Sequence, residues 1–272
     1  MIFVCPKCSS RFVSFRGNSA VCENGHCYDK SREGYYNFLP PSSPHTHGDN
    51  KEMLLARRAF LDTGLYGPLA DGVVSLALKH APHARTLLDI GCGEGYYTRA
   101  IMDAFKKVES PFSLAAFDIS KDAVRLAAKR AAGADFAVAS AYRVPILDLE
   151  IDLAFNMFSP LALSEIVRLL SPSGVFVMAI PDENHLFELK AAIYDTPYKN
   201  EPQDFSLSGL TLLESRKISY KMKLDTKEKI LSLFTMTPYA YRTRNEDVDR
   251  LLSLDSLDVT ASFIVIVYKK SC

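Results

Sequence analysis

Four residues that commonly bind metal stand at two short spacings near the start of the chain. Cys5 and Cys8 form a C-x2-C pair, and after thirteen residues Cys22 and His26 form a C-x3-H pair. Thiolates and imidazoles at these spacings are typical of a tetrahedral zinc site. A segment this short cannot build a core that folds alone, so the metal would act as a structural cross-link. Four protein ligands leave no open position for a substrate, which argues against chemistry at the metal.

Two alternatives stay open at this motif. Cys27 directly follows His26 and could replace it as the fourth ligand. The cysteines could also be buried thiols or disulfide partners. Because four of the six cysteines fall within the first 27 residues, we favour metal binding in a reducing cytosol over a secreted disulfide framework.

A second motif, the glycine-rich run Asp89-Ile90-Gly91-Cys92-Gly93-Glu94-Gly95, follows an apolar segment. Glycines at positions 91, 93 and 95 let the backbone turn tightly and approach a ligand without a Cβ in the way. Such a string is shared with dinucleotide-binding enzymes, so its charges must decide the ligand. One acid, Asp89, precedes the loop, and a second, Glu94, lies inside it. The acid inside the loop would repel a pyrophosphate at the following helix N-terminus.

A third acid, Asp118, closes the next predicted strand, where a carboxylate can accept hydrogen bonds from both ribose hydroxyls. The loop with its acids suits a cationic nucleoside without phosphate, such as S-adenosylmethionine, better than NAD. An incidental strand, turn and helix is the alternative without function.

Strands and helices that alternate from residue 86 onwards would position this loop. The pattern predicts an α/β fold with a mostly parallel sheet and helices on both faces. The expected strands are 86–90, 113–117, 135–139, 151–158, 175–180, 210–224 and 259–268. The expected helices are 53–61, 68–80, a helix ending near 105, 121–132, 160–170, 185–194 and 227–234. We also expect a capping box with Asp49 as N-cap and Glu52 at N3, and a turn over residues 171–174.

Composition sets outer limits on the function. The 272 residues are 48% hydrophobic with zero net charge, which fits one main globular domain plus a small appendage. No apolar stretch is long enough for a membrane span, and the start lacks the layout of a signal peptide. Residues 1–60 hold eight Lys/Arg against five Asp/Glu, a net charge of +3 that is compatible with RNA contact.

The glycine-rich run matches D-x-G-x-G-x-G, the first motif of the class I methyltransferases, and this resemblance implies their Rossmann-like α/β fold. Together with the cysteine motif, the chain closely resembles the bacterial 23S ribosomal RNA guanine-N1 methyltransferases, nearly end to end. The stretches that carry this resemblance are residues 5–26, 33–40, 56–62, 88–98 and 185–190.

The resemblance implies zinc at Cys5, Cys8, Cys22 and His26, and cofactor contacts from Tyr66, the Gly93–Gly95 loop and His185. Two of these residues have an alternative without function: Tyr66 could be a packing tyrosine, and His185 a structural histidine. Arg57 and Arg58 could contact phosphate or form a solvated helix face. His45 and His47 could be a metal pair, but we favour exposed linker residues.

The implied reaction is transfer of the S-adenosylmethionine methyl group to N1 of a guanine in a hairpin loop of 23S ribosomal RNA. The base must lose its N1 proton and leave its stack to reach the methyl group. No N-P-P-Y-type acceptor loop is present, and no general base is assigned. Weak candidates are Asn156 and Asp152 near the end of the fourth strand, and Asp182 and Glu183 after the fifth.

We therefore expect residues 1–40 to form a zinc-binding, RNA-recognition domain, 41–48 a linker, and 49–272 the methyltransferase domain of a cytoplasmic enzyme. Lys7, Arg11 and Arg16 would grip the RNA. A zinc arm on a Pro-rich linker could reach a partner subunit, so a homodimer stays open. The rival functions are a small-molecule methyltransferase with a zinc lid, a non-catalytic RNA-binding factor, and an NAD-linked enzyme.

Overall fold

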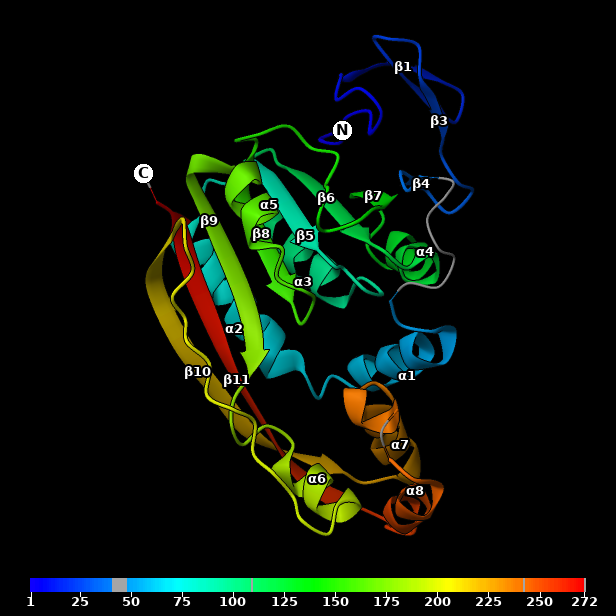
Figure 1. Cartoon of the computed structure of the whole chain (residues 1–272), viewed down its shortest axis with the longest axis vertical. Helices are drawn as coiled ribbons and strands as arrows, with labels where there is room; N and C mark the ends of the chain where they lie inside the picture. Colours follow the sequence, from blue (N-terminus) through cyan, green and yellow to red (C-terminus); the bar gives the residue numbers. More distant parts are fainter. Residues whose placement is uncertain (41–47, 109, 242, 272) are drawn as a thin grey trace.

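The computed structural model describes residues 1–40, 48–108, 110–241 and 243–271 (Figure 1). The expected linker over 41–48, with His45 and His47, lies outside the described residues except for Gly48. The described chain forms a three-stranded sheet near the N-terminus and an eight-stranded sheet that makes up the main body.

The small sheet is an antiparallel arrangement that brings the two halves of the cysteine motif together. Its strands are β1 (Phe12–Arg16), β2 (Ser19–Cys22) and β3 (Cys27–Asp29). Arg16 pairs with Ser19, and Gly17 adopts a φ of 60° in the two-residue loop between them. Glycine is favoured there because a tight hairpin loop requires a left-handed residue.

The large sheet has the strand order β10-β11-β9-β8-β5-β6-β7-β4. Its strands are β4 (Tyr35–Asn37), β5 (Thr86–Ile90), β6 (Ser113–Asp118), β7 (Asp135–Val138), β8 (Ile151–Met157), β9 (Leu170–Pro181), β10 (Leu210–Leu224) and β11 (Leu257–Lys270). Strands β4 to β9 pair in parallel, whereas β11 pairs antiparallel with both β9 and β10. The expected Rossmann-like class I methyltransferase fold is confirmed. In such a sheet ligands bind at the carboxyl edge, near the switch point between β5 and β8.

The helices connect these strands and cover the sheet. They are α1 (Lys51–Asp62), α2 (Gly67–His80), α3 (Tyr96–Phe105), α4 (Lys121–Arg130), α5 (Leu163–Leu169), α6 (Phe187–Ile193), α7 (Lys227–Thr235) and α8 (Asn245–Leu252), with the 3-10 turn η1 (Pro238–Tyr241). None of the helices in the described part of the chain combines the length and the apolar character needed to cross a membrane.

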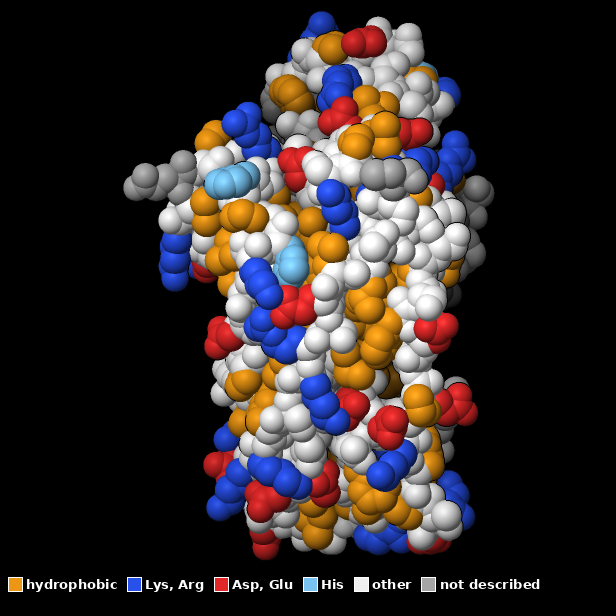
Figure 2. Space-filling view, turned by 90° about the vertical axis from the view of Figure 1, so that its left-hand side faces the viewer, with side chains coloured by type: hydrophobic (Ala, Val, Ile, Leu, Met, Phe, Trp, Pro, Cys, Tyr) orange, Lys and Arg blue, Asp and Glu red, His pale blue; other side chains and the backbone are white. Residues whose placement is uncertain are grey.

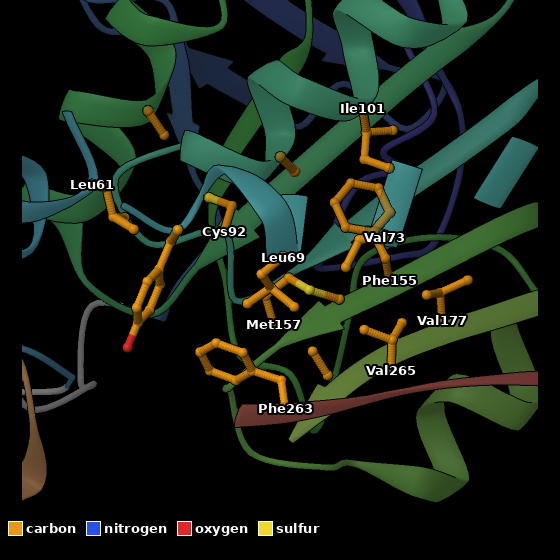
Figure 3. Close-up of a cluster of buried hydrophobic side chains, with 14 of the residues drawn as sticks. Leu61, Leu69, Val73, Cys92, Ile101, Phe155, Met157, Val177, Phe263 and Val265 are labelled. Atoms are coloured by element: carbon orange, nitrogen blue, oxygen red, sulfur yellow. The ribbon is translucent and has the colours of Figure 1, made fainter. Parts of the chain in front are cut away.

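Two buried clusters lie on the two faces of the large sheet, because neighbouring residues of a strand point to opposite faces. Leu87 of β5 belongs to one cluster and Leu88 to the other. In the first cluster, side chains of α2 and α3 meet those of β8, β9 and β11, as Val73, Ile101 and Phe155 show in Figure 3. The sheet is thus covered on both faces, and its carboxyl edge is left for ligands.

The small sheet docks against the amino edge of the large sheet (top of Figure 1). Phe3 is buried in the second cluster, and the Val4 amide donates to the Pro145 carbonyl at 2.8 Å. Arg11 pairs with Glu150, which directly precedes β8. β4 in turn pairs with β7, so residues 35–37 already belong to the large sheet; the domain border at residue 40 stays a prediction.

Two local expectations were wrong. The N-cap of α1 is Asn50, whose Oδ1 accepts from the Met53 amide at 2.9 Å, whereas Asp49 pairs with Arg57. Residues 171–174 fall within β9 rather than in a separate turn. Because Ile151 pairs with Leu170 and Leu153 with Val175, these four residues bulge out of the ladder. The sequence also gave no expectation for α8 or η1.

The basic residues of edge strand β10 do not form a free cationic stripe. Lys217 pairs with Asp182, and Lys221 pairs with Glu188. Figure 2 shows this face of the molecule with basic and acidic side chains interspersed. Paired lysines on an exposed edge strand protect it from strand addition, so we assign this face no RNA contact.

A close approach between α3 and α4 depends on Gly95. Its φ is 89°, and a Cβ built there would lie 2.8 Å from Cα of Ala127 on α4. The Gly95→Ala variant should lose about 2 to 4 kcal/mol of unfolding free energy, because left-handed strain and overpacking add. Urea titration measures the loss.

Gly64 is the matched control, with a φ of 76° and open space around its Cβ position. Gly64→Ala should lose only about 1 kcal/mol, the cost of strain alone. Equal losses at the two positions would contradict the role of helix packing.

Candidate cofactor site and metal centre

The glycine-rich loop between β5 and α3 is pinned to the neighbouring strands. The amides of Gly91 and Cys92 donate to the Phe117 carbonyl at 3.0 and 2.9 Å. From the other side, the Ser159 hydroxyl donates to the Ile90 carbonyl at 2.8 Å. A Cβ at Gly91 would lie 2.3 Å from Cβ of Ser159, so only glycine fits there. The loop therefore exposes its backbone in one fixed path at the switch point.

Asp118 reaches this loop from the end of β6. One carboxylate oxygen accepts from the Gly93 amide at 3.0 Å, and the other accepts from the Ser120 amide at 2.8 Å. Burial raises the pKa of this carboxyl, although both hydrogen bonds oppose the shift. The structure thus brings Asp118 together with the loop, as the sequence predicted.

Asp89 and Glu94 are both buried beside the loop. Burial raises the pKa of Asp89 to about 7; a hydrogen bond from Thr98 opposes the shift, and the nearby Asp118 charge adds to it. Burial likewise raises the pKa of Glu94 to about 7, even though Arg130 donates to its Oε1 at 2.8 Å. The Oε2 atom of Glu94 has no hydrogen-bond partner among the described residues.

This donor set fits S-adenosylmethionine and does not fit NAD. Three carboxyl groups surround the loop, and the two arginines beside it are already paired with acids, Arg130 with Glu94 and Arg57 with Asp49. A cationic ligand would favour their ionised forms and could use the orphaned acceptor of Glu94. The site therefore fits a positively charged nucleoside without phosphate.

Tyr66 and His185 meet at a cluster of aromatic rings. We define the aromatic cluster as Tyr66, Tyr97, Phe158, His185 and Phe263. The ring centroid of Phe263 lies 5.1 Å from that of Tyr66, 4.4 Å from that of His185 and 5.6 Å from that of Phe158. Tyr97, two residues past the glycine loop, lies 6.3 Å from Phe158. The cluster thus connects the two implied cofactor-contact residues to the end of the loop.

His185 is held neutral within the aromatic cluster. Burial, together with the nearby Lys190 ammonium, lowers its pKa to about 3. Its Nδ1 accepts from the Ser262 amide at 3.3 Å, which leaves the proton on Nε2. A neutral ring can pack against an uncharged part of a ligand without a desolvation cost for a charge. Direct cofactor contact by Tyr66 and His185 stays a prediction.

The four predicted metal ligands come together in the small domain. One ligand atom from each of Cys5, Cys8, Cys22 and His26 lies within 4.8 Å of the others. The Cys8 and Cys22 sulfurs are 3.7 Å apart, and Nδ1 of His26 lies 3.5 Å from the Cys22 sulfur and 3.6 Å from that of Cys5. A zinc tetrahedron has edges of about 3.8 Å between sulfurs and about 3.6 Å between sulfur and nitrogen. The site fits zinc without rearrangement.

Cys27, the alternative fourth ligand, is exposed and stands outside this group. The geometry therefore selects His26. The group sits at the amino edge of the large sheet, while the glycine loop sits at its carboxyl edge (Figure 1). A metal there cannot contact a reaction at the loop, so its role is structural.

The candidates for a general base do not meet at the loop. Asp152 was expected near the end of β8, yet it lies at the start of that strand, where it accepts from the amides of Arg85 and Thr86. Asn156 uses both ends of its amide to close the turn after β8, and Asp182 pairs with Lys217. Glu183 shows no side-chain contact that suggests proton transfer, and the catalytic base stays unassigned.

Sequence reasoning missed Ser159, Phe158 and Phe263 as site residues. Phe158 was expected only as the last residue of the strand 151–158, and Ser159 follows it directly. Phe263 sits within an expected β-branched strand, 259–268, with no local signal. Only the antiparallel placement of β11 next to β9 brings Phe263 to the site. Such long-range pairing cannot be read from a single strand.

Comparison with known proteins identifies the family. The family model of a methyltransferase domain matches residues 83–235, and that of the RlmA N-terminal zinc ribbon matches residues 3–46. The Bacillus subtilis protein YxjB, provisionally named a 23S rRNA (guanine-N1)-methyltransferase, is 31% identical over 99% of this chain and 97% of its own length. The chain belongs to the 23S rRNA (guanine-N1)-methyltransferase family.

Two further relatives agree with this family. The 23S rRNA (guanine(748)-N1)-methyltransferase of Streptomyces fradiae is 34% identical over 70% of this chain and 66% of the relative. A protein of Micromonospora griseorubida, provisionally named a 23S rRNA (guanine-N1)-methyltransferase, is 30% identical over 82% of this chain and 80% of its own length. The protein is thus an enzyme of the methyltransferase class with a zinc-ribbon domain ahead of its catalytic domain.

Substitution of a cluster cysteine tests the metal centre. The Cys22→Ser variant should lose stoichiometric zinc and unfold the small sheet, because structural zinc supplies on the order of 10 kcal/mol to such units. Cys27→Ser is the matched control and should retain one zinc per chain. Elemental analysis of the purified proteins measures both, and zinc loss from Cys27→Ser would contradict the assignment of His26.

The raised pKa of Asp89 predicts a pH dependence of stability. Between 3.8, its ordinary value, and about 7, the folded protein binds more protons than the unfolded chain. The unfolding free energy of the cofactor-free protein should therefore fall as pH rises through this window, and Asp89→Asn should flatten the fall. Urea titrations at several pH values measure it. Asp71→Asn, at an exposed site on α2, should keep the wild-type profile; an unchanged profile in Asp89→Asn would contradict the shift.

Proposed function

We propose that this protein transfers the methyl group of S-adenosylmethionine to N1 of a guanine in a hairpin loop of 23S ribosomal RNA. The observation that carries the proposal is the junction of Asp118 with the Gly91–Gly95 loop at the switch point of the sheet. Family membership supports the RNA substrate, and the names of the relatives support guanine N1 as the acceptor.

In this reaction the cofactor supplies an electrophilic methyl group on its sulfonium. Asp118 would hold the ribose hydroxyls, and the glycine loop would bring backbone close to the nucleoside. The buried carboxyls of Asp89 and Glu94 would complement the positive charge of the ligand. The protein's main contribution is orientation, which places the acceptor nitrogen in line with the bond to be broken.

The zinc ribbon would act as a second RNA contact, distant from the reaction. Lys7 and Arg16 are exposed on it, whereas Arg11 pairs with Glu150 and helps to fix its position. Because β5 separates the two edges by roughly 15 to 20 Å, one RNA hairpin is long enough to contact both. The ribbon would therefore recognise the shape of the stem while the carboxyl edge receives the loop. A homodimer, in which one ribbon serves a partner's site, stays a prediction.

Methyl incorporation tests this function. Labelled S-adenosylmethionine is incubated with the protein and 23S rRNA from a strain that lacks this modification. We expect incorporation and one new reverse-transcription stop in a hairpin loop, since a methyl on N1 blocks base pairing.

Asp118→Ala is the inactive control, because loss of charge-assisted hydrogen bonds should weaken cofactor binding about 10- to 100-fold. Free guanosine is the substrate control. Methylation of free guanosine without any stop in the RNA would contradict an rRNA substrate and favour a small-molecule methyltransferase.

A further inference from the structure

Phe158, beside the glycine loop, has a left-handed backbone and a half-exposed aromatic ring, and each of these is unfavourable. It follows β8 directly, adopts a φ of 64°, and leaves 47% of its surface exposed. A bulky side chain in the left-handed region is a true outlier, and such strain persists only where surrounding contacts enforce it.

The surrounding turn holds Phe158 in this conformation. Asn156 accepts from the Ser159 amide at 3.1 Å and donates to the Pro160 carbonyl at 3.3 Å. Ser159 in turn donates to Ile90 at the start of the glycine loop. The ring is therefore presented beside the cofactor loop by a turn that is bonded at both ends.

A second observation comes from the other side of the ring. The Tyr97 ring meets Phe158 edge to face, at 6.3 Å between centroids. The Tyr97 hydroxyl is buried and has no hydrogen-bond partner among the described residues. Phe158 also packs against Phe263, a member of the first buried cluster (Figure 3), with 5.6 Å between ring centroids. The ring is thus supported from the core, while 47% of the residue stays exposed.

We infer that Phe158 is the platform on which the extruded target guanine stacks. This inference rests on the proposed function. Proteins recognise unstacked RNA bases by stacking them on aromatic rings. The turn that carries Phe158 is bonded to the glycine loop through Ser159, so a base on this ring would lie beside the loop at which we propose that the cofactor binds.

The first test uses Phe158→Gly, which removes the ring and also relieves the backbone, since glycine adopts a positive φ without strain. We expect the variant to stay folded, because relief of backbone strain offsets the lost ring contacts with Tyr97 and Phe263. Its affinity for S-adenosylmethionine is measured separately, and kcat/KM for RNA is compared at saturating cofactor. Its kcat/KM for RNA methylation should fall about 5- to 150-fold, the range measured for loss of one base–aromatic contact. Phe158→Leu should show a similar fall, because it is apolar but not aromatic.

Leu161→Ala is the matched control, because Leu161 is another exposed apolar residue three positions further on. It should keep wild-type kcat/KM. Full RNA methylation by Phe158→Gly would overturn the stacking role while leaving the proposed function intact. Absence of RNA methylation by the wild-type protein would instead overturn the proposed function itself.

A spectroscopic test follows from the absence of tryptophan in the chain. Phe158→Trp places the only indole at the proposed platform and should retain RNA methylation. The probe is the RNA hairpin that carries the mapped stop, added in the presence of S-adenosylhomocysteine. Stacking on guanine should quench the tryptophan fluorescence. Tyr142→Trp, at a position that is 68% exposed, is the control and should not be quenched. Equal fluorescence changes in the two variants would contradict stacking at Phe158.

Discussion

The structure depends on the close packing of one turn, the glycine loop between β5 and α3. Neighbouring atoms occupy the space of a Cβ at two of its positions, from Ser159 of the loop after β8 at Gly91 and from Ala127 of α4 at Gly95. Because the turn cannot move away from either neighbour, the ends of β5, β6 and β8 are held in one arrangement. That arrangement places Asp118 and the buried acids beside the loop and the aromatic cluster at its end.

The two edges of the large sheet have separate tasks. The amino edge receives the zinc ribbon through Phe3, Val4 and Arg11, which fixes the ribbon without involving the reaction. The carboxyl edge holds the carboxyls, whose raised pKa values show how much burial outweighs their hydrogen bonds. A cationic ligand would relieve this cost and an anionic one would add to it, so the buried acids favour the cationic cofactor that we propose.

Patterns within short stretches of sequence predicted the features that depend on residues close together in the chain. The zinc ligands, the glycine loop and Asp118 were found from spacing, because each depends on residues close in sequence or on the rule that parallel strands end at one edge. Phe263 and Phe158 were not found, since one reaches the site through the pairing of β11 with β9 and the other through a left-handed turn. Asp152 was misplaced although the expected strand 151–158 already puts it at the start, which lies at the opposite edge of the sheet from the loop. The predicted N-cap of α1 was also wrong, because Asp49 pairs with Arg57 and Asn50 caps the helix instead.

The most direct measurement of the central claim is calorimetric binding of S-adenosylmethionine and of NAD to the same protein without RNA. The account predicts binding of S-adenosylmethionine and no detectable binding of NAD, because the buried acids favour a cation and repel a pyrophosphate. Asp118→Asn, which keeps the shape of the side chain but removes its charge, should weaken the first interaction. Binding of NAD at comparable affinity, or of S-adenosylmethionine with no dependence on Asp118, would contradict the assignment of this site.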